Sequence, residues 1–311
     1  MTEPTTTPPS DRDKYAHVLE ALFTAALNAS GFDTVCALLR VGGMADANWD
    51  AFDESRIAFD DYNWMLEKVS AERGVTAARR MALLMYCQAV EMTGAQEMMA
   101  NLLRCTLKRP YVVDPFADLW LRKKKSALFA IPPSATKKYR RVKELAVEAS
   151  RQDVADAVDA FFDDRIRNAF SHSDYIITET SFRFTEQGIP QQIPVATLDE
   201  IIQRAFAFFG ALLYQHQRWL RRLGKSKRYH RMPNYEVLEL LTDEAADLHG
   251  FRVHFSNGNS ATYARRPSGV EATNLVFERD GSINFTVGPL DALEPQWKID
   301  GKPVLDWQAL P

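Results

Sequence analysis

The side chains in this sequence that could do chemistry are concentrated in one short stretch, residues 165–172. The stretch holds two arginines, an amide, a hydroxyl and an imidazole: Arg165, Arg167, Asn168, Ser171 and His172. Histidine exchanges a proton near neutral pH, and the planar fork of arginine matches the oxygens of a phosphate or carboxylate. The stretch therefore brings an acid–base group and an anion-binding group close together along the chain.

Helical spacing decides which of these groups can act together. Asn168 and His172 are four positions apart and share one face of a helix. Arg167 and His172 are five positions apart, which is about 140° around a helix. Either the helix ends near Ser171, or Arg167 works with a second subunit. Arg165 lies seven positions before His172, on the same face, and is the alternative partner.

The run from Arg167 to His172, R-N-A-F-S-H, resembles the signature of the HEPN superfamily. That signature is an arginine, usually followed by a polar residue such as asparagine, with a histidine after four to six intervening residues. Here Asn168 fills the polar position and four residues intervene. The surroundings are similar too, with a helix before the motif and an extended segment and a long apolar helix after it. The resemblance covers residues 75–232.

This resemblance implies a metal-independent endoribonuclease, often a toxin or an antiviral defence effector, that works as a homodimer formed by the helical domain. Carried over to this sequence, His172 and Arg167 would be the catalytic pair. Asn168 would support them by hydrogen bonding, and Arg165 and Ser171 would be auxiliary residues. An antitoxin or another regulatory protein is an expected partner, besides RNA. Neither a metal nor another cofactor is expected.

The implied reaction suits these side chains. RNA carries its own nucleophile, the 2′-OH next to the scissile phosphate. A histidine with an ordinary pKa of about 6.5 can serve as base or acid near neutral pH. An arginine can bind the phosphate oxygens through two parallel hydrogen bonds. The expected products carry a 2′,3′-cyclic phosphate and a 5′-OH.

Other interpretations of the same residues stay open. His172 could be a histidine stabilised by the dipole at the end of a helix, and Asn168 an ordinary exposed residue. Arg165 could be the ion-pair partner of a neighbouring acid such as Asp164. The whole chain could then be a HEPN-like module that binds RNA or a protein without cleaving. It could also be a helical scaffold in which the motif is a coincidence.

A second feature is the basic segment 218–231, which contains no acidic residue. Its candidate RNA-binding residues are Arg218, Arg221, Arg222, Lys225, Lys227 and Arg228. These side chains could follow a phosphate backbone, while Trp219 and Tyr229 stack on bases. The alternative is a solvated helix end whose positive charges complement the helix dipole.

Composition limits the class of protein. The chain has 311 residues, 46% of them hydrophobic, and a formal charge of −3, which argues against coating nucleic acid over the whole surface. The three cysteines, Cys36, Cys87 and Cys105, are widely spaced and are expected to be buried thiols rather than disulfides or zinc ligands. No signal peptide and no run of about 18 apolar residues is present. These features predict a cytoplasmic protein without a membrane partner.

The predicted fold is mainly α, a HEPN-like helical bundle with additional N-terminal helices and a small C-terminal β module. Four regions are expected: a disordered tail at 1–9, N-terminal helices at 10–74, a HEPN-like domain at 75–249 with a β insert near 176–192, and a β-rich module at 250–311. Apolar periodicity and capping signals predict helices near 10–29, 33–43, 53–72, 93–107, 152–170, 197–223 and 234–249. A basic helix is expected to start at Ser134 or Thr136, and the segment 76–92 is apolar and rich in methionine. Gly224 and Gly250 are predicted to stop the helices at 197–223 and 234–249.

Overall fold

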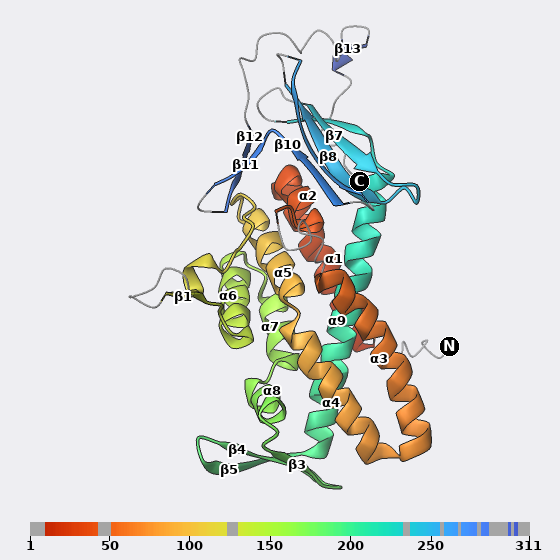
Figure 1. Ribbon diagram of the computed structural model, residues 1–311, viewed down its shortest axis with the longest axis vertical. Helices are drawn as coiled ribbons and strands as arrows, with labels where there is room; N and C mark the ends of the chain where they lie inside the picture. The colour runs from red at the N-terminus through yellow and green to blue at the C-terminus, as the bar shows by residue number, and fades with distance from the viewer. Residues whose placement is uncertain are drawn as a thin grey trace, which may run out of the picture. The chain divides into compact units, whose positions relative to one another are not determined.

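The computed structural model describes residues 10–42, 51–122, 130–232, 237–255, 258–266, 269–278 and 281–285, together with strand backbone at 298–299 and 302–303 (Figure 1). Within these residues the protein is mainly helical, with strands gathered toward the C-terminus, which confirms the predicted class in outline. The predicted tail at 1–9 lies outside the described residues.

The helices are α1 (Asp11–Ala29), α2 (Gly31–Leu39), α3 (Ala51–Arg73), α4 (Val75–Glu91), α5 (Thr93–Thr106), the short 3₁₀ helix η2 (Ala117–Leu119), α6 (Ala135–Glu148), α7 (Gln152–Phe161), α8 (Asp164–Ser171) and α9 (Val195–Gly224). The described residues form two compact units. Unit 1 draws on Met1–Ala21, Phe52–Gln96 and Pro133–Gln215, and unit 2 on Leu22–Ala51, Glu97–Pro132 and His216–Pro311. The division falls within α1, α5 and α9, and after the first residue of α3.

An aromatic cluster forms part of the core of unit 1. The ring of Phe161 in α7 lies 4.6 Å from that of Phe208 in α9 and 5.7 Å from that of Tyr139 in α6. All three side chains are buried. Tilted and edge-on ring pairs of this kind add to the free energy of burial. The cluster fixes α7 immediately before the chain turns into the motif.

A three-stranded antiparallel sheet follows the motif, in the order β3-β4-β5, and confirms the predicted β insert. Its strands are β3 (Tyr175–Ile177), β4 (Ser181–Glu186) and β5 (Ile189–Pro194). Along β4, Phe182 and Phe184 are buried while Arg183 and Thr185 are exposed, so one face packs inward and the other faces solvent. A two-residue turn at 187–188, with φ of 50° and 80°, joins β4 to β5 as hairpins of this type require.

Unit 2 contains a five-stranded antiparallel sheet in the order β10-β9-β8-β7-β6. Its strands are β6 (Tyr229–Arg231), β7 (Val237–Thr242), β8 (Leu248–His254), β9 (Ser260–Arg266) and β10 (Gly269–Thr273), followed by the short pairs β11 (Leu275–Phe277) with β12 (Ile283–Phe285) and β13 (Lys298–Ile299) with β14 (Lys302–Pro303). Another short pair, β1 (Leu121–Arg122) with β2 (Ala130–Ile131), lies earlier in the chain. Phe251 of β8 packs on Phe32 of α2, with 5.1 Å between ring centroids.

Two predicted helices are wrong. The single helix expected over 152–170 is broken between α7 and α8. The helix expected over 234–249 is replaced, in its described part, by β7 and the start of β8. The sheet therefore begins with β6, before the expected boundary at 250. In β7, Leu238 and Leu240 are buried and pair with residues of β8, so pairing with neighbouring strands overrides the helical pattern.

The two glycines predicted to stop helices differ in their outcome. α9 ends at Gly224, as predicted, whereas Gly250 is inside β8. A Cβ on Gly224 would lie 2.1 Å from the carbonyl oxygen of Ala246, and one on Gly250 would lie 2.3 Å from that of Tyr263. Both positions need glycine because another stretch of backbone approaches closely.

A buried carboxylate organises the polar face of the five-stranded sheet. The Glu239 side chain is 3% exposed and is paired with Arg228, Arg252 and His254. Nε of Arg228 donates a hydrogen bond of 2.7 Å to Oε1, and Nε2 of His254 lies 2.8 Å from Oε2. Burial by itself would raise the pKa of the Glu239 carboxyl, but the hydrogen bonds from His254 and Arg228 hold that pKa below its ordinary value.

This arrangement predicts acid-sensitive stability. Because the pKa of Glu239 is lower in the folded protein, its ionised carboxylate contributes its full stabilisation at pH values above the unfolded pKa of about 4.3. This stabilisation is lost as the pH falls through the folded pKa. We expect Glu239→Gln to lower the free energy of unfolding at pH 7 by about 2 kcal/mol, less than for a fully buried pair, because Arg228 is 63% exposed. Urea unfolding at pH 7 and at acid pH measures this, with the more exposed Glu271→Gln as control. Equal losses in the two variants would contradict it.

Candidate functional site

The motif helix α8 begins at a break held by one buried tyrosine. The hydroxyl of Tyr86, in α4, accepts a hydrogen bond of 3.0 Å from the backbone N–H of Asp163 and donates one of 3.3 Å to the carbonyl of the same residue. Phe162 and Asp163 are extended, so α7 cannot continue. Burial raises the pKa of the Tyr86 hydroxyl, which keeps it protonated and able to donate.

Asp163 then starts the new helix. Its Oδ1 accepts a hydrogen bond of 2.9 Å from the backbone N–H of Arg165, as an N-cap side chain does. The same carboxylate binds the Arg165 guanidinium through Nε at 3.0 Å and Nη2 at 2.6 Å. This pairing raises the pKa of Arg165. Arg165 thus has an acidic partner, as one interpretation of the sequence predicted, although the partner is Asp163 rather than Asp164.

The other end of α8 is closed by a left-handed cap. His172 is the C-cap residue, and Ser173 follows with φ of 55°. The N–H of Ser173 donates to the carbonyl of Phe170 at 3.0 Å, and the N–H of Asp174 to that of Ala169 at 2.9 Å. This is the hydrogen-bond pattern of the Schellman motif. The helix therefore ends at Ser171, which was one of the two geometries the spacing allowed.

Three of the candidate residues in the stretch 165–172 line one pocket. A cavity of about 420 Å³ lies between α8 and the β4–β5 hairpin, and its walls include Arg165, Asn168 and His172. Its opposite wall comes from β4 and the turn after it. Neither Arg167 nor Ser171 is among the lining residues. The structure therefore brings the imidazole, the amide and the alternative arginine together, and leaves the first-choice arginine outside the cavity.

Arg167 is turned toward α4. Its guanidinium forms an ion pair with Glu91, and its Nη1 donates a hydrogen bond of 2.8 Å to Oδ1 of Asn168. Since arginine has only donors, the oxygen of the Asn168 amide must face it. The amide nitrogen of Asn168 is then the group left for other partners. Arg167 acts on the pocket through Asn168 rather than directly.

His172 is exposed at the pocket wall, and its ring makes no hydrogen bond or ion pair with any residue that the structure describes. The carboxylates of Asp164, Asp174 and Glu186 line the same pocket. Arg165 is the one arginine or lysine among the lining residues that the structure describes. The pocket therefore offers an exposed imidazole that has no hydrogen-bond partner in the described chain, in surroundings with more negative than positive charge.

The cysteines take no part in this chemistry. Cys36, Cys87 and Cys105 are buried and free of disulfides, as predicted. Burial raises the pKa of the Cys87 thiol, in α4, to about 12. The positive charge of Arg167 lowers this pKa, but by less than burial raises it. A thiol with such a pKa remains protonated near neutral pH and is a poor nucleophile.

The basic segment 218–231 is only partly available for binding. Trp219 is 1% exposed and packs beneath the guanidinium of Arg222, 4.6 Å from the ring centroid, so its predicted stacking on bases is wrong. Arg221 is paired with Asp247, and Arg228 with the buried Glu239. Arg218, Lys225 and Lys227 are exposed. Much of the predicted phosphate-binding charge is therefore committed to structural contacts.

The sequence interpretation missed the residues that the hairpin contributes. Asp174, Thr185 and Glu186 complete the wall opposite α8. Alternation along β4 was the available signal, because it places Thr185 on the same exposed face as Arg183. What the sequence could not supply was the reversal after Ser173, which folds this strand back beside α8.

Comparisons with known proteins give no match: no protein family fits the chain, and no curated protein or solved structure is significantly similar to it. Among the described residues, no helix is long and apolar enough to cross a membrane. In the same residues, no group of three or more His, Cys, Asp or Glu side chains is arranged to hold a metal ion. The chemistry and geometry of the pocket therefore carry the functional assignment.

The Tyr86 contact can be tested by stability. Tyr86→Phe removes the hydroxyl and leaves the N–H and carbonyl of Asp163 without that partner. We expect the free energy of unfolding to fall by about 1–3 kcal/mol, the range for an unsatisfied buried polar group. Urea denaturation measures it, with Tyr214→Phe, at an exposed tyrosine of the same unit, as the matched control. Equal stability of Tyr86→Phe and wild type would show that the break does not depend on this hydroxyl.

Proposed function

We propose that this protein is a metal-independent endoribonuclease of the HEPN type, acting as a cytoplasmic toxin or antiviral effector and as a homodimer. The observation that carries the proposal is the convergence of Arg165, Asn168 and His172 on one pocket. Two of these three belong to the R-N-x-x-x-H motif. The third meets the longer spacing that the same signature allows.

Each side chain has a role in this reaction. His172 takes the proton from the 2′-OH of RNA and, once protonated, can return a proton to the leaving 5′-oxygen. The amide nitrogen of Asn168 and the guanidinium of Arg165 donate hydrogen bonds to the phosphate oxygens as negative charge develops on them. Asp163 occupies Nε and Nη2 of Arg165, and within the described chain Nη1 is left for substrate.

Arg167 is then a positioning residue. Its hydrogen bond to Asn168 fixes which end of the amide faces the substrate. The ion pair with Glu91 holds Arg167 in this position. Direct contact of Arg167 with the scissile phosphate, the pairing that the family resemblance implies, requires this ion pair to open.

A second function is favoured by a specific observation. The carboxylates of Asp164, Asp174 and Glu186 around His172 repel a polyanion and attract a basic surface. This charge suits a non-catalytic HEPN-like module that binds a basic segment of a partner protein, such as a regulatory protein. Cleavage and partner binding make opposite predictions for substitutions of His172.

The proposed chemistry predicts cleavage of RNA in the presence of EDTA. We expect fragments with 2′,3′-cyclic phosphate and 5′-OH ends, and a loss of about 100- to 10,000-fold in rate for His172→Ala. Single-turnover assays on a labelled single-stranded RNA, followed by end-group analysis, measure both. His17→Ala is the matched control because His17 is an exposed histidine of unit 1 that lines neither the motif pocket nor the sheet beside it.

Intact RNA with the wild-type protein at every protein concentration would reject the nuclease. Activity that disappears with EDTA would reject the metal-independent mechanism. Cleavage that survives in His172→Ala would show that the pocket described above is not the active site.

The two arginines can be separated by their substitutions. We expect Arg165→Ala to lower the cleavage rate about 100-fold, because a donor aimed at the transition state is lost. Arg167→Ala should have the smaller effect, about tenfold, because it acts through Asn168. Arg204→Ala is the control, because Arg204 is a partly exposed arginine on α9 that is likewise ion-paired. The reverse order, with Arg167→Ala inactive and Arg165→Ala active, would establish Arg167 as the partner of His172.

A further inference from the structure

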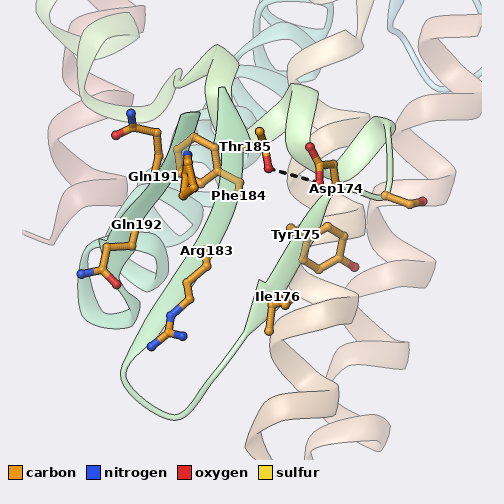
Figure 2. A pocket seen from close by; sticks show the side chains of 10 residues that line it. Asp174, Tyr175, Ile176, Arg183, Phe184, Thr185, Gln191 and Gln192 are labelled. Atoms are coloured by element: carbon orange, nitrogen blue, oxygen red, sulfur yellow. Dashed lines mark hydrogen bonds between the residues drawn. The ribbon is translucent and has the colours of Figure 1, made fainter. Parts of the chain in front are cut away.

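A second pocket adjoins the motif pocket and has no assigned role. It is an open cavity of about 730 Å³ on the β3–β4–β5 sheet, and its lining includes Asp174, Ile176, Arg183, Thr185, Gln191 and Gln192 (Figure 2). Asp174 and Thr185 also line the motif pocket, as does Phe184. The two cavities therefore share a wall and lie side by side within unit 1.

Strand register places the useful side chains together. Arg183 of β4 pairs with Ile176 of β3 on one side and with Gln192 of β5 on the other. Directly paired residues project from the same face of a sheet, with Cβ atoms about 5 Å apart. Figure 2 shows Arg183 and Gln192 extending from neighbouring strands on the same side. The aliphatic side chain of Ile176, the guanidinium of Arg183 and the amide of Gln192 therefore form one row across the sheet.

These polar groups have unused hydrogen-bonding capacity. Nε of Arg183 donates to Oγ of Ser181 at 3.2 Å, but its guanidinium forms no ion pair with any acidic residue that the structure describes. The side-chain amides of Gln191 and Gln192 likewise make no hydrogen bond within the described chain. Most described arginines of the same unit are paired with a carboxylate: Arg56, Arg79, Arg141, Arg151, Arg165, Arg167 and Arg204. Arg12, Arg73, Arg80 and Arg140 share with Arg183 the lack of an ion pair within the described chain, but none of these four lines either pocket.

The chemistry of the row matches one nucleotide of a single strand. An unpaired guanidinium binds a phosphate through parallel hydrogen bonds. An amide offers both a donor and acceptor, as the edge of a base requires, and single-stranded RNA exposes these edges. The side chain of Ile176 is 64% exposed and provides an apolar surface for the base or the sugar. The phosphate, the base edge and the apolar surface of one nucleotide would each contact a different side chain of this row.

The link to the motif pocket suggests a polymer rather than a free nucleotide. Arg183 and Thr185 lie on the same face of β4, two residues apart, which is about 6.6 Å along a strand. Thr185 forms part of the motif pocket wall. A strand whose scissile phosphate lies beside His172 can therefore reach Arg183 with its next nucleotide.

We propose that the β3–β4–β5 pocket is a single-nucleotide subsite for the RNA residue next to the scissile phosphate, in which Arg183 binds the phosphate and Gln192 reads the base. Arg183 adds a second cation beside Arg165, the one arginine or lysine among the described residues that line the motif pocket. This inference rests on the proposed function, and it adds a substrate-binding site and a source of base preference.

Binding tests the subsite without any cleavage. The probe is a fluorescent single-stranded RNA of six nucleotides with 2′-O-methyl groups, which removes the nucleophile. We expect Arg183→Ala to weaken its binding about tenfold at low salt and to reduce the slope of log K against log salt concentration by about 0.7, the value for one phosphate contact. Arg183→Lys keeps the charge but loses the fork, so intermediate binding is expected. Arg204→Ala should bind like wild type.

Cleavage then tests the base reading. We expect Gln192→Ala to change the preference among the four bases next to the cut at least threefold, while Gln203→Ala, at an exposed glutamine of α9, leaves it unchanged. Circular dichroism confirms that each variant is folded.

The outcomes separate the two proposals. If RNA is cut through His172 but Arg183→Ala and Gln192→Ala behave like wild type, the subsite is wrong and the nuclease stands. If the probe binds through Arg183 but RNA is never cut, the nucleotide subsite stands and the nuclease fails. If the probe does not bind the wild-type protein at low salt, the subsite is rejected.

Discussion

The candidate site depends on the hydroxyl of Tyr86, which holds both backbone polar groups of Asp163 at the break between α7 and α8. A backbone N–H without a helical partner would oppose such a break, because it costs free energy when unpaired. The carbonyl of Asp163 also accepts the first hydrogen bond of α8, from the N–H of Arg167. With its N–H satisfied by Tyr86, Asp163 can cap α8 and bind Arg165. The direction of α8, and with it the position of Asn168 and His172, follows from this contact.

Electrostatics is the main difficulty for a nuclease at this site. The acidic lining of the motif pocket opposes a polyanion, while the unpaired Arg183 in the adjoining pocket favours one. The distribution of charge makes sense if RNA is held mainly by the sheet and only the scissile group enters beside His172. Under the proposed function, salt would therefore affect RNA cleavage and RNA binding to different degrees.

The sequence predicted the parts of the site that depend on local spacing. Asn168 and His172 share a pocket because they are four residues apart on α8, and the helix ends at Ser171 as the geometry allowed. The break at 162–163 could not be predicted, because its cause is Tyr86, 77 residues away. The strand β7 and the start of β8 were missed for a similar reason, since pairing partners outside the expected helix 234–249 decided its conformation.

The turn at 187–188 has a consequence for how such a site can evolve. A Cβ on Gly188 would have no neighbouring atom within 4 Å, so packing does not constrain this position. The constraint on the turn is its pair of positive φ angles. Gln187, beside Gly188, nevertheless belongs to the pocket wall. Under the proposed function, insertions and substitutions here would alter which RNA the pocket accepts, while α8 keeps its N-cap, its C-terminal Schellman motif and its histidine. RNA recognition and cleavage chemistry could then diverge at separate rates in descendants of this chain.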